Sequence, residues 1–498
     1  MMTIKQFWIS GRRLGRRLGR VLVAALPDRM RFSLYRRVVN CDPVSDSRLE
    51  LKVAETQEEL EACYALLHDA YVASGFMQPH PSGLRVTPYH ALPTTTTLCA
   101  KVKGRVVGTL SIVREGVFGF PMQRVFDISA VRAKEGRLAE ISALAIHPRY
   151  RKTGGSILFP LMKFMYGYCT QYFDTRHLLI AVNPAHIEMY ESLLFFKRLT
   201  AKTVDNYDFV NGAPAVGATL DLDEAPELFR KAYAHKPGRR NLHHYFTAVT
   251  LPSIRFPSRP WHTSSDPVLT PTLLHHLFNC RTQALAAMDE RQRLLLHSIY
   301  QEPEWTAVLP PLTGAIDNQQ LLRRHPRYTT RCAAQLVPED SGATALGATL
   351  VEISSQGFKA RMPGPLPVGL RCTVTAELGP GELTRVQARL ARCVNSETGQ
   401  FFGFEVETPD TAWQRCVDWL ENREAALTRP GELIQELPTG AEGASTASGA
   451  AASAWPTLAS AAAAGKPLLK PPTPALMPRT THPRRGRSDE EAALSTER

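Results

Sequence analysis

A glutamate inside an otherwise apolar stretch is the first residue whose position suggests chemistry. Residues 138–146 read LAEISALAI, which predicts a strand buried on both faces, so Glu140 would have apolar neighbours. An ionisable group is costly there unless it is used or paired. Burial would raise the pKa of this carboxyl towards the range of a general base. Glu140 is therefore a candidate base, and an ion pair with a nearby arginine is the alternative.

A glycine-containing turn follows this strand and precedes an apolar-periodic stretch at 157–173 that predicts a helix. Glycines permit close backbone approach, and the N–H groups and dipole of a helix N-terminus attract anions. Such a turn is also common without any ligand, but Arg149 and Lys152 beside it favour phosphate. The candidate anion-binding residues are Arg151, Gly154, Gly155 and Ser156.

A second short strand at 177–182 leads into a helix that begins after Asn183, with Pro184 suited to its first turn. Tyr190 comes four residues after His186, so both lie on one face of that helix. They are candidates for proton transfer. The alternative is that Tyr190 packs in the core and His186 caps the helix.

These elements belong to a chain of 498 residues, long enough for two or three domains. Its nine cysteines are scattered without a CxxC pair, which suits a reducing cytoplasm and predicts neither a metal site nor disulfides. The net charge of +12 is concentrated at the N-terminus, where the first 50 residues hold about 11 Lys/Arg against about 4 Asp/Glu. We therefore expect no nucleic-acid partner.

The N-terminal stretch at 7–26 reads FWISGRRLGRRLGRVLVAAL and could form a basic amphipathic helix on an anionic membrane surface. The alternative is a solvated basic arm, since three glycines weaken the helix. No apolar run approaches the ~18–20 residues that span a bilayer.

The pattern predicts further elements around the candidate base. Thr56 and Glu59 have capping-box spacing before a helix that reaches Tyr71. Loops are expected at 75–93 and 116–122, a hairpin at 94–101 and 105–113, closing strands at 212–222 and 242–247, and a long spacer helix at 270–300.

Short alternating strands then predict a small all-β barrel, followed by a helix at 411–423. Beyond Pro430 the composition of Ala, Gly, Ser, Thr and Pro predicts a disordered tail. The six expected strands are 329–337, 349–353, 357–362, 370–377, 383–393 and 400–406.

Five short motifs occur in order between Leu51 and Leu222. Together they resemble the GNAT superfamily of acyltransferases and, within it, the N-acyl amino acid synthases, relatives of the acyl-homoserine-lactone synthases. The resemblance implies an α/β (α+β) fold with a mixed central sheet. The motifs are RVVGT at 105–109, GFPM at 119–122, EIS at 140–142, RKTGGS at 151–156, and VNPAH at 182–186 with Tyr190 after it.

Such enzymes move a fatty acyl group from a phosphopantetheine thioester to the amine of an amino acid. The resemblance implies acyl carrier protein as the usual donor, with acyl-CoA as the other possibility, and no tightly bound cofactor. Glu140 would then be the base and Tyr190 the proton donor to the thiolate, with His186 as a further catalytic candidate.

The same resemblance places the thioester's phosphate at the glycine turn. Arg151, Gly154 and Ser156 occupy the positions of the family's pyrophosphate loop, although Ser156 stands where Gly or Ala is usual. Asn183 would orient the helix start or the pantetheine amide. Ala143 stands where the lactone synthases carry arginine, which argues against homoserine-lactone chemistry.

The barrel region resembles a PilZ domain, the cyclic di-GMP receptor. Arg323 and Arg327 match its RxxxR arm, and arginines can stack on guanine and hold phosphate with two hydrogen bonds. Ser354 and Gly357 match its second motif, with Glu352 where Asp or Asn is usual. The resemblance implies cyclic di-GMP as an effector; a solvated basic arm is the alternative.

The sequence therefore predicts an N-acyltransferase for an amino acid that is regulated by cyclic di-GMP. We expect it in the cytoplasm, with peripheral contact to the inner face of the membrane. The alternatives are an inactive acyltransferase fold acting as a signalling adaptor that responds to cyclic di-GMP, and an acetyltransferase using acetyl-CoA. The expected parts are a basic segment at 1–49, the synthase domain at 50–250, a Pro-rich and helical linker at 251–320, the barrel at 321–425 and the tail at 426–498.

Overall fold

The computed structural model describes residues 26–428, apart from 38, 45, 152, 174, 258, 267, 301–302, 313–326, 340–344, 363 and 397–398. Most of the predicted basic helix, residues 7–25, and the predicted tail from residue 429 lie outside this range. Within it, no helix is long and apolar enough to cross a membrane.

An eight-stranded mixed sheet forms the first domain, in the order β1-β2-β3-β4-β5-β8-β6 with β7 paired to β8. Only β4 and β5 run parallel, and every other pair is antiparallel. The acyltransferase-type sheet expected from the sequence is thereby confirmed. Its strands are β1 (Leu49–Val53), β2 (Thr95–Val102), β3 (Arg105–Arg114), β4 (Arg137–Ile146), β5 (Thr175–Val182), β6 (Lys197–Arg198), β7 (Val204–Tyr207) and β8 (Ala213–Asp221).

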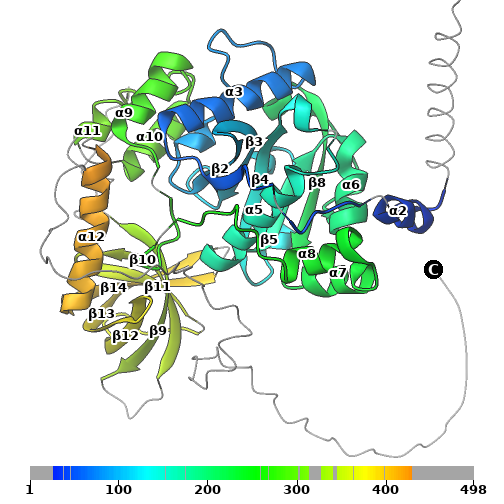
Figure 1. Cartoon of the computed structure of the whole chain (residues 1–498). Helices are drawn as coiled ribbons and strands as arrows, with labels where there is room; N and C mark the ends of the chain where they lie inside the picture. The colour runs from blue at the N-terminus through cyan, green and yellow to red at the C-terminus, as the bar shows by residue number, and fades with distance from the viewer. Residues whose placement is uncertain are drawn as a thin grey trace, which may run out of the picture. The chain divides into compact units, whose positions relative to one another are not determined.

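Two helices cover opposite faces of this sheet (Figure 1). Helix α3 (Gln57–Ala73) begins where Thr56 accepts the Glu59 N–H, as the capping-box spacing predicts. Helix α5 (Leu158–Tyr172) packs with Leu178 and Leu220 on the other face. Alternation along a strand places Glu140 on the α3 face, because its neighbour Ala139 packs with α5.

Shorter helices surround the sheet. Helix α2, at the N-terminal end of the described chain, had no clear signal in the sequence, and it contacts α6 through the pair Tyr35 and Glu188. The remaining bounds here are α2 (Asp28–Arg37), α4 (Ser129–Arg132), α6 (Pro184–Leu194) and α7 (Ala225–Tyr233), with 3-10 turns at Pro88–Ala91, Pro121–Arg124, Pro148–Tyr150, Asp208–Val210 and Gly238–Arg240.

The strand predicted at 242–247 is wrong, because this segment is helix α8 (Leu242–Thr247). Its aromatic residues favour a strand locally, but the Asn241 side chain accepts the His244 N–H and begins a helix. Leu242 and Tyr245, three residues apart, then bury on one side.

The long helix predicted at 270–300 is also wrong, since it is divided into α9 (Pro271–Leu274), a π-helical stretch (His275–Arg281) and α10 (Glu290–Ile299). The break carries Leu285 and Met288 into a core shared with α3, and Asp289 caps a new helix. Burial of these side chains therefore overrides the helical periodicity of the sequence. Helix α11 (Pro303–Thr306) contributes Trp305 to the same core. This region packs as part of the globular structure and is not an isolated spacer.

The second domain is a closed barrel of six antiparallel strands in the order β10-β11-β14-β13-β12-β9, as the sequence predicts (Figure 1). Trp413 of helix α12 (Thr411–Thr428) is fully buried against it. The strands are β9 (Tyr328–Pro338), β10 (Leu346–Ser354), β11 (Gly357–Arg361), β12 (Arg371–Gly379), β13 (Glu382–Ser396) and β14 (Gly399–Thr408).

Candidate active site

The central parallel strands separate at the point where Glu140 lies. Strands β4 and β5 pair from Arg137 opposite Thr175 to Glu140 opposite Leu179, and no described pair continues beyond it. Strand β4 is also irregular just after this point, because Ala143 has φ of 55° and the β3–β4 register shifts there. The two strands therefore leave an opening in the sheet, where β4 still pairs with β3 but has no described pairing with β5.

Glu140 lies on the rim of this opening and is 2% exposed. Its Oε2 accepts a hydrogen bond from the Met122 N–H at 3.0 Å. Burial raises the pKa of this carboxyl to about 8, and the Met122 hydrogen bond lowers it only in part. Glu140 has no ion pair with a described arginine, so the structural alternative raised by the sequence lacks its partner.

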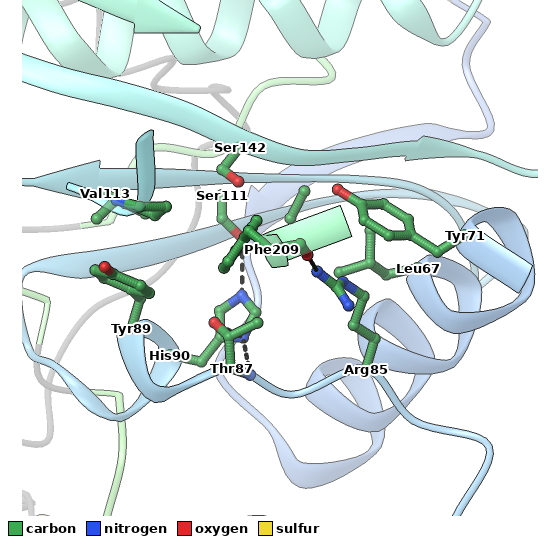
Figure 2. A pocket seen from close by; sticks show the side chains of 12 residues that line it. Leu67, Tyr71, Arg85, Thr87, Tyr89, His90, Ser111, Val113, Ser142 and Phe209 are labelled. Carbon is green, nitrogen blue, oxygen red and sulfur yellow. Dashed lines mark hydrogen bonds between the residues drawn. The ribbon is translucent and has the colours of Figure 1, made fainter. Parts of the chain in front are cut away.

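A small cavity lies on the α3 face of the sheet (Figure 2). Its empty space of about 280 Å³ includes a part that is open to solvent. Its wall includes Val113, which pairs with Glu140, and Pro121, which precedes Met122. The remaining lining residues are Leu67, Tyr71, Arg85, Thr87, Tyr89, His90, Ser111, Ser142, Ala143 and Phe209.

Tyr71 of α3 lines the cavity, and the charges of both Arg85 and Glu140 affect its pKa. Burial raises the pKa of Tyr71, the Arg85 charge lowers it, and the Glu140 charge raises it. Tyr190 of α6 packs with the core on the α5 side, yet its pKa is raised to about 12 by burial and by Tyr71. The raised pKa means that Tyr190 keeps its proton at neutral pH.

The floor of the cavity is a fixed polar network around His90. Its Nδ1 accepts the Thr87 N–H at 3.1 Å, so Nε2 carries the proton towards the Ser111 hydroxyl at 3.4 Å (Figure 2). Burial, with a contribution from Arg85, lowers the pKa of His90 to about 3. His90 is therefore a neutral residue that positions the loop between α3 and β2.

The other two candidates near the start of α6, Asn183 and His186, do not pack in the core as Tyr190 does. Asn183 caps the helix, since its side chain accepts the Ala185 N–H at 3.0 Å. His186 is exposed on the first turn of α6. The catalytic role of His186 stays a prediction, because the structure places its side chain on the exposed surface of α6.

The predicted anion-binding turn has the expected backbone. Gly154 and Gly155 have φ of 69° and 85°, and a Cβ on Gly155 would lie 2.5 Å from the Phe159 ring. No side chain caps α5, so N–H groups remain available at its first turn. Ser156 bonds to Thr153, and exposed Arg151 donates to the Ile146 carbonyl at 2.7 Å.

A second cavity of about 510 Å³ lies on the α5 face of the same sheet. Its lining is almost wholly apolar, and residues of α5, β5, β8, α7 and α8 contribute to it. They include Met162, Met165, Leu178, Leu220, Ala225 and Phe229.

Sequence reasoning found Glu140 and Tyr190 but missed the wall that surrounds them. Arg85 and Tyr89 lie in a segment read only as a loop, and Tyr71 was read as the end of a helix. No motif marks these residues. A lone arginine in a stretch without charged neighbours was the one available signal.

In the barrel, Arg327 lies 3.3 Å from Glu352 in an ion pair, and Lys359 also approaches Glu352. Ser354 donates to the Gly357 carbonyl at 3.0 Å. A Cβ on Gly357 would lie 2.2 Å from the Phe404 carbonyl oxygen, so glycine is required where β11 meets β14. Arg323 lies outside the described residues.

Comparison with known families assigns both domains. Residues 62–221 match the family model described as N-acyl amino acid synthase FeeM. Residues 321–421 match the PilZ domain model. No curated protein matches the chain.

Solved structures include similar proteins for the first domain. FeeM, an N-acyl amino acid synthase from uncultured soil microbes, shares 25% identity, with 36% of this chain and 94% of that chain covered and a TM-score of 0.31. BjaI, a CoA-dependent acyl-homoserine lactone synthase, shares 17% identity, with 42% of this chain and 94% of that chain covered and a TM-score of 0.31. A GNAT-family acetyltransferase from Streptococcus pneumoniae shares 14% identity, with 35% of this chain and 98% of that chain covered and a TM-score of 0.26.

Proposed function

We propose that this chain, an N-acyltransferase with a FeeM-type N-acyl amino acid synthase domain and a PilZ domain, moves a long-chain acyl group to the amine of an amino acid. The observation that supports this most strongly is Glu140, a buried carboxyl at the opening between β4 and β5. A base with a pKa near the operating pH suits the removal of an amine proton.

The proposed reaction uses this chain's own groups. Glu140 takes a proton from the acceptor's ammonium group, and the free amine attacks the thioester carbonyl. The C–N bond forms and the C–S bond breaks, and Tyr190 gives a proton to the departing thiolate. The second proton lost by the attacking nitrogen returns to Tyr190, and the proton on Glu140 passes to solvent. Backbone N–H groups of β4 beyond the last pair with β5 would polarise the carbonyl oxygen, as an oxyanion hole does.

The donor is a phosphopantetheine thioester, on acyl carrier protein or CoA. The turn formed by Arg151, Gly154, Gly155 and Ser156 would hold its phosphate at the N-terminus of α5. Asn183, at the N-terminus of α6, would face the pantetheine arm. Because the apolar cavity lies on the α5 face, we assign it to the acyl chain.

The barrel would receive cyclic di-GMP through Arg323 and Arg327, with Ser354 and Gly357 on the adjoining strand. Glu352 already occupies Arg327 in an ion pair, so the dinucleotide's phosphate must replace this carboxylate. The second candidate function, a signalling adaptor with an inactive acyltransferase fold, does not account for a buried carboxyl with a raised pKa beside a cavity.

Lipid extracts of cells that overproduce the protein test the proposed function. We expect acyl-amino acids that are absent from cells producing Glu140→Gln, detected by mass spectrometry. Identical extracts from the two strains would favour the adaptor. Membrane attachment through residues 1–26 is a separate proposal, tested by vesicle binding of the chain with and without that segment.

A further inference from the structure

The wall of the small cavity holds a cation that the proposed proton and phosphate steps do not use. Arg85 lies between α3 and β2, half-buried, and its guanidinium faces the cavity (Figure 2). Its partial exposure leaves it accessible to a small molecule that enters beside Glu140.

The contacts of Arg85 fix its position without neutralising its charge. One N–H donates to the Phe209 carbonyl at 2.6 Å, and the guanidinium lies 4.3 Å from the Tyr71 ring centre and 5.1 Å from that of Phe209. Among the described residues, no carboxylate forms an ion pair with it. Burial lowers its pKa, and the groups that oppose this shift are Tyr71 and Tyr207.

A desolvated cation is costly unless an anion compensates it. Arginine also binds carboxylate with two parallel hydrogen bonds. Because aromatic contacts and a carbonyl hold the guanidinium in place, it is oriented before any ligand arrives.

The charges of Arg85 and Glu140 both act on Tyr71, which lines the cavity. Tyr71 is affected by both charges, and burial is the larger cause of its raised pKa. Tyr207 is affected by Glu140, and it in turn raises the pKa of Arg85. Ser142, two residues along β4 from Glu140, lines the cavity together with Arg85, so Glu140 points to the same face of the sheet.

We propose that Arg85 binds the α-carboxylate of the acceptor amino acid while Glu140 receives a proton from its α-amine. This rests on the proposed function and adds to it the residue that recognises the acceptor's carboxylate. The cavity is partly open to solvent, so a small acceptor can approach Arg85 from outside. Leu67, Tyr89 and Val113 would line an apolar or aromatic side chain.

The test compares amino acids with amines that differ only by the carboxylate, using phenylalanine against phenethylamine and leucine against 3-methylbutylamine. The purified full-length chain and a long-chain acyl thioester are used, and kcat/KM is measured for each acceptor. We expect the wild type to prefer each amino acid by about 10- to 100-fold, the range of a charge-assisted hydrogen-bonded pair.

In Arg85→Gln this preference should fall to within about threefold, through a higher KM for the amino acid and little change for the amine. Glutamine can still donate to the Phe209 carbonyl, and turnover of the amine shows that the variant is folded. Arg176→Gln is the matched control, because Arg176 pairs with Asp221 and Asp223 at the end of β8. A full preference in an active Arg85→Gln would overturn the proposal.

An arm with the wild type alone makes the test independent of any variant. Phenylpropionate, which keeps the carboxylate but lacks the amine, should inhibit competitively against the amino acid, and phenylpropionamide should not. Equal inhibition by both compounds would overturn the role of Arg85. No transfer by the wild type to any acceptor would instead contradict the proposed function.

Discussion

At the scale of single residues, the account depends on one carboxyl in an apolar setting. Glu140 accepts a single backbone hydrogen bond, and burial raises its pKa to about 8. The group must be ionised to accept the amine proton, and a raised pKa means that ionisation occurs late as the pH rises. Burial of Glu140 therefore determines both its strength as a base and the pH dependence expected of the reaction.

The pH profile is the first prediction. We expect kcat/KM to rise with pH and to level off above a value near 8, because the ionised fraction of Glu140 rises through that range. Glu140→Gln should reduce kcat about 10²- to 10⁴-fold and remove this limb of the profile. Its circular dichroism spectrum should match the wild type, since glutamine is neutral in the same buried position. An unchanged profile in a folded variant would exclude Glu140 as the base.

At the scale of elements, the separation of β4 from β5 makes the site. Pairing ends at Glu140, and a residue with positive φ follows three positions later. The small cavity lies on the α3 face of this sheet and the apolar cavity on its α5 face. In the proposed function the acceptor binds on one side of the sheet and the acyl chain on the other.

The length of the acyl chain should respond to the size of the apolar cavity. Ala225→Phe, at the start of α7, should fill part of the space and shift the preferred donor to shorter chains by several carbons. Met162→Ala enlarges the same cavity and should therefore have the opposite effect, favouring longer chains. Steady-state rates across acyl thioesters of graded length measure both. If both variants keep the wild-type preference, the chain binds elsewhere.

The elements around the site differ in how far the sequence predicts them. The strand at 138–146 and the helix at 157–173 are confirmed as β4 and α5, because each has one period and clear end signals. The segments 242–247 and 270–300 were misread, since capping by Asn241 and burial of Leu285 decide their structure. Arg85 could not be assigned, because its role depends on Tyr71 and Phe209, which are distant in sequence.

At the scale of the whole molecule, the chain joins an N-acyltransferase domain to a PilZ barrel. The proposed regulation requires cyclic di-GMP to bind where Arg327 is held by Glu352 at 3.3 Å. Both side chains are partly exposed, so this ion pair stabilises the free state only slightly, by up to about 1 kcal/mol. The carboxylate should therefore weaken ligand binding without preventing it.

Calorimetry on the full-length chain checks this competition. Glu352→Asp shortens the carboxylate and should tighten cyclic di-GMP binding by up to about fivefold, as loss of a partly exposed ion pair allows. Arg327→Ala should abolish binding. Glu405→Asp, in the exposed pair with Arg389 on the same barrel, is the control and should change nothing. Undetectable binding in both the wild type and Glu352→Asp would leave the barrel without this ligand.

The most direct test of the central claim follows the atoms of the transfer. The purified chain is incubated with a long-chain acyl thioester and a ¹⁵N-labelled amino acid, and free thiol and N-acyl product are quantified together by mass spectrometry. We predict one thiol released for each ¹⁵N-acyl amino acid formed, and loss of both with Glu140→Gln. Thiol release without labelled amide, or equal product from Glu140→Gln, would contradict the account.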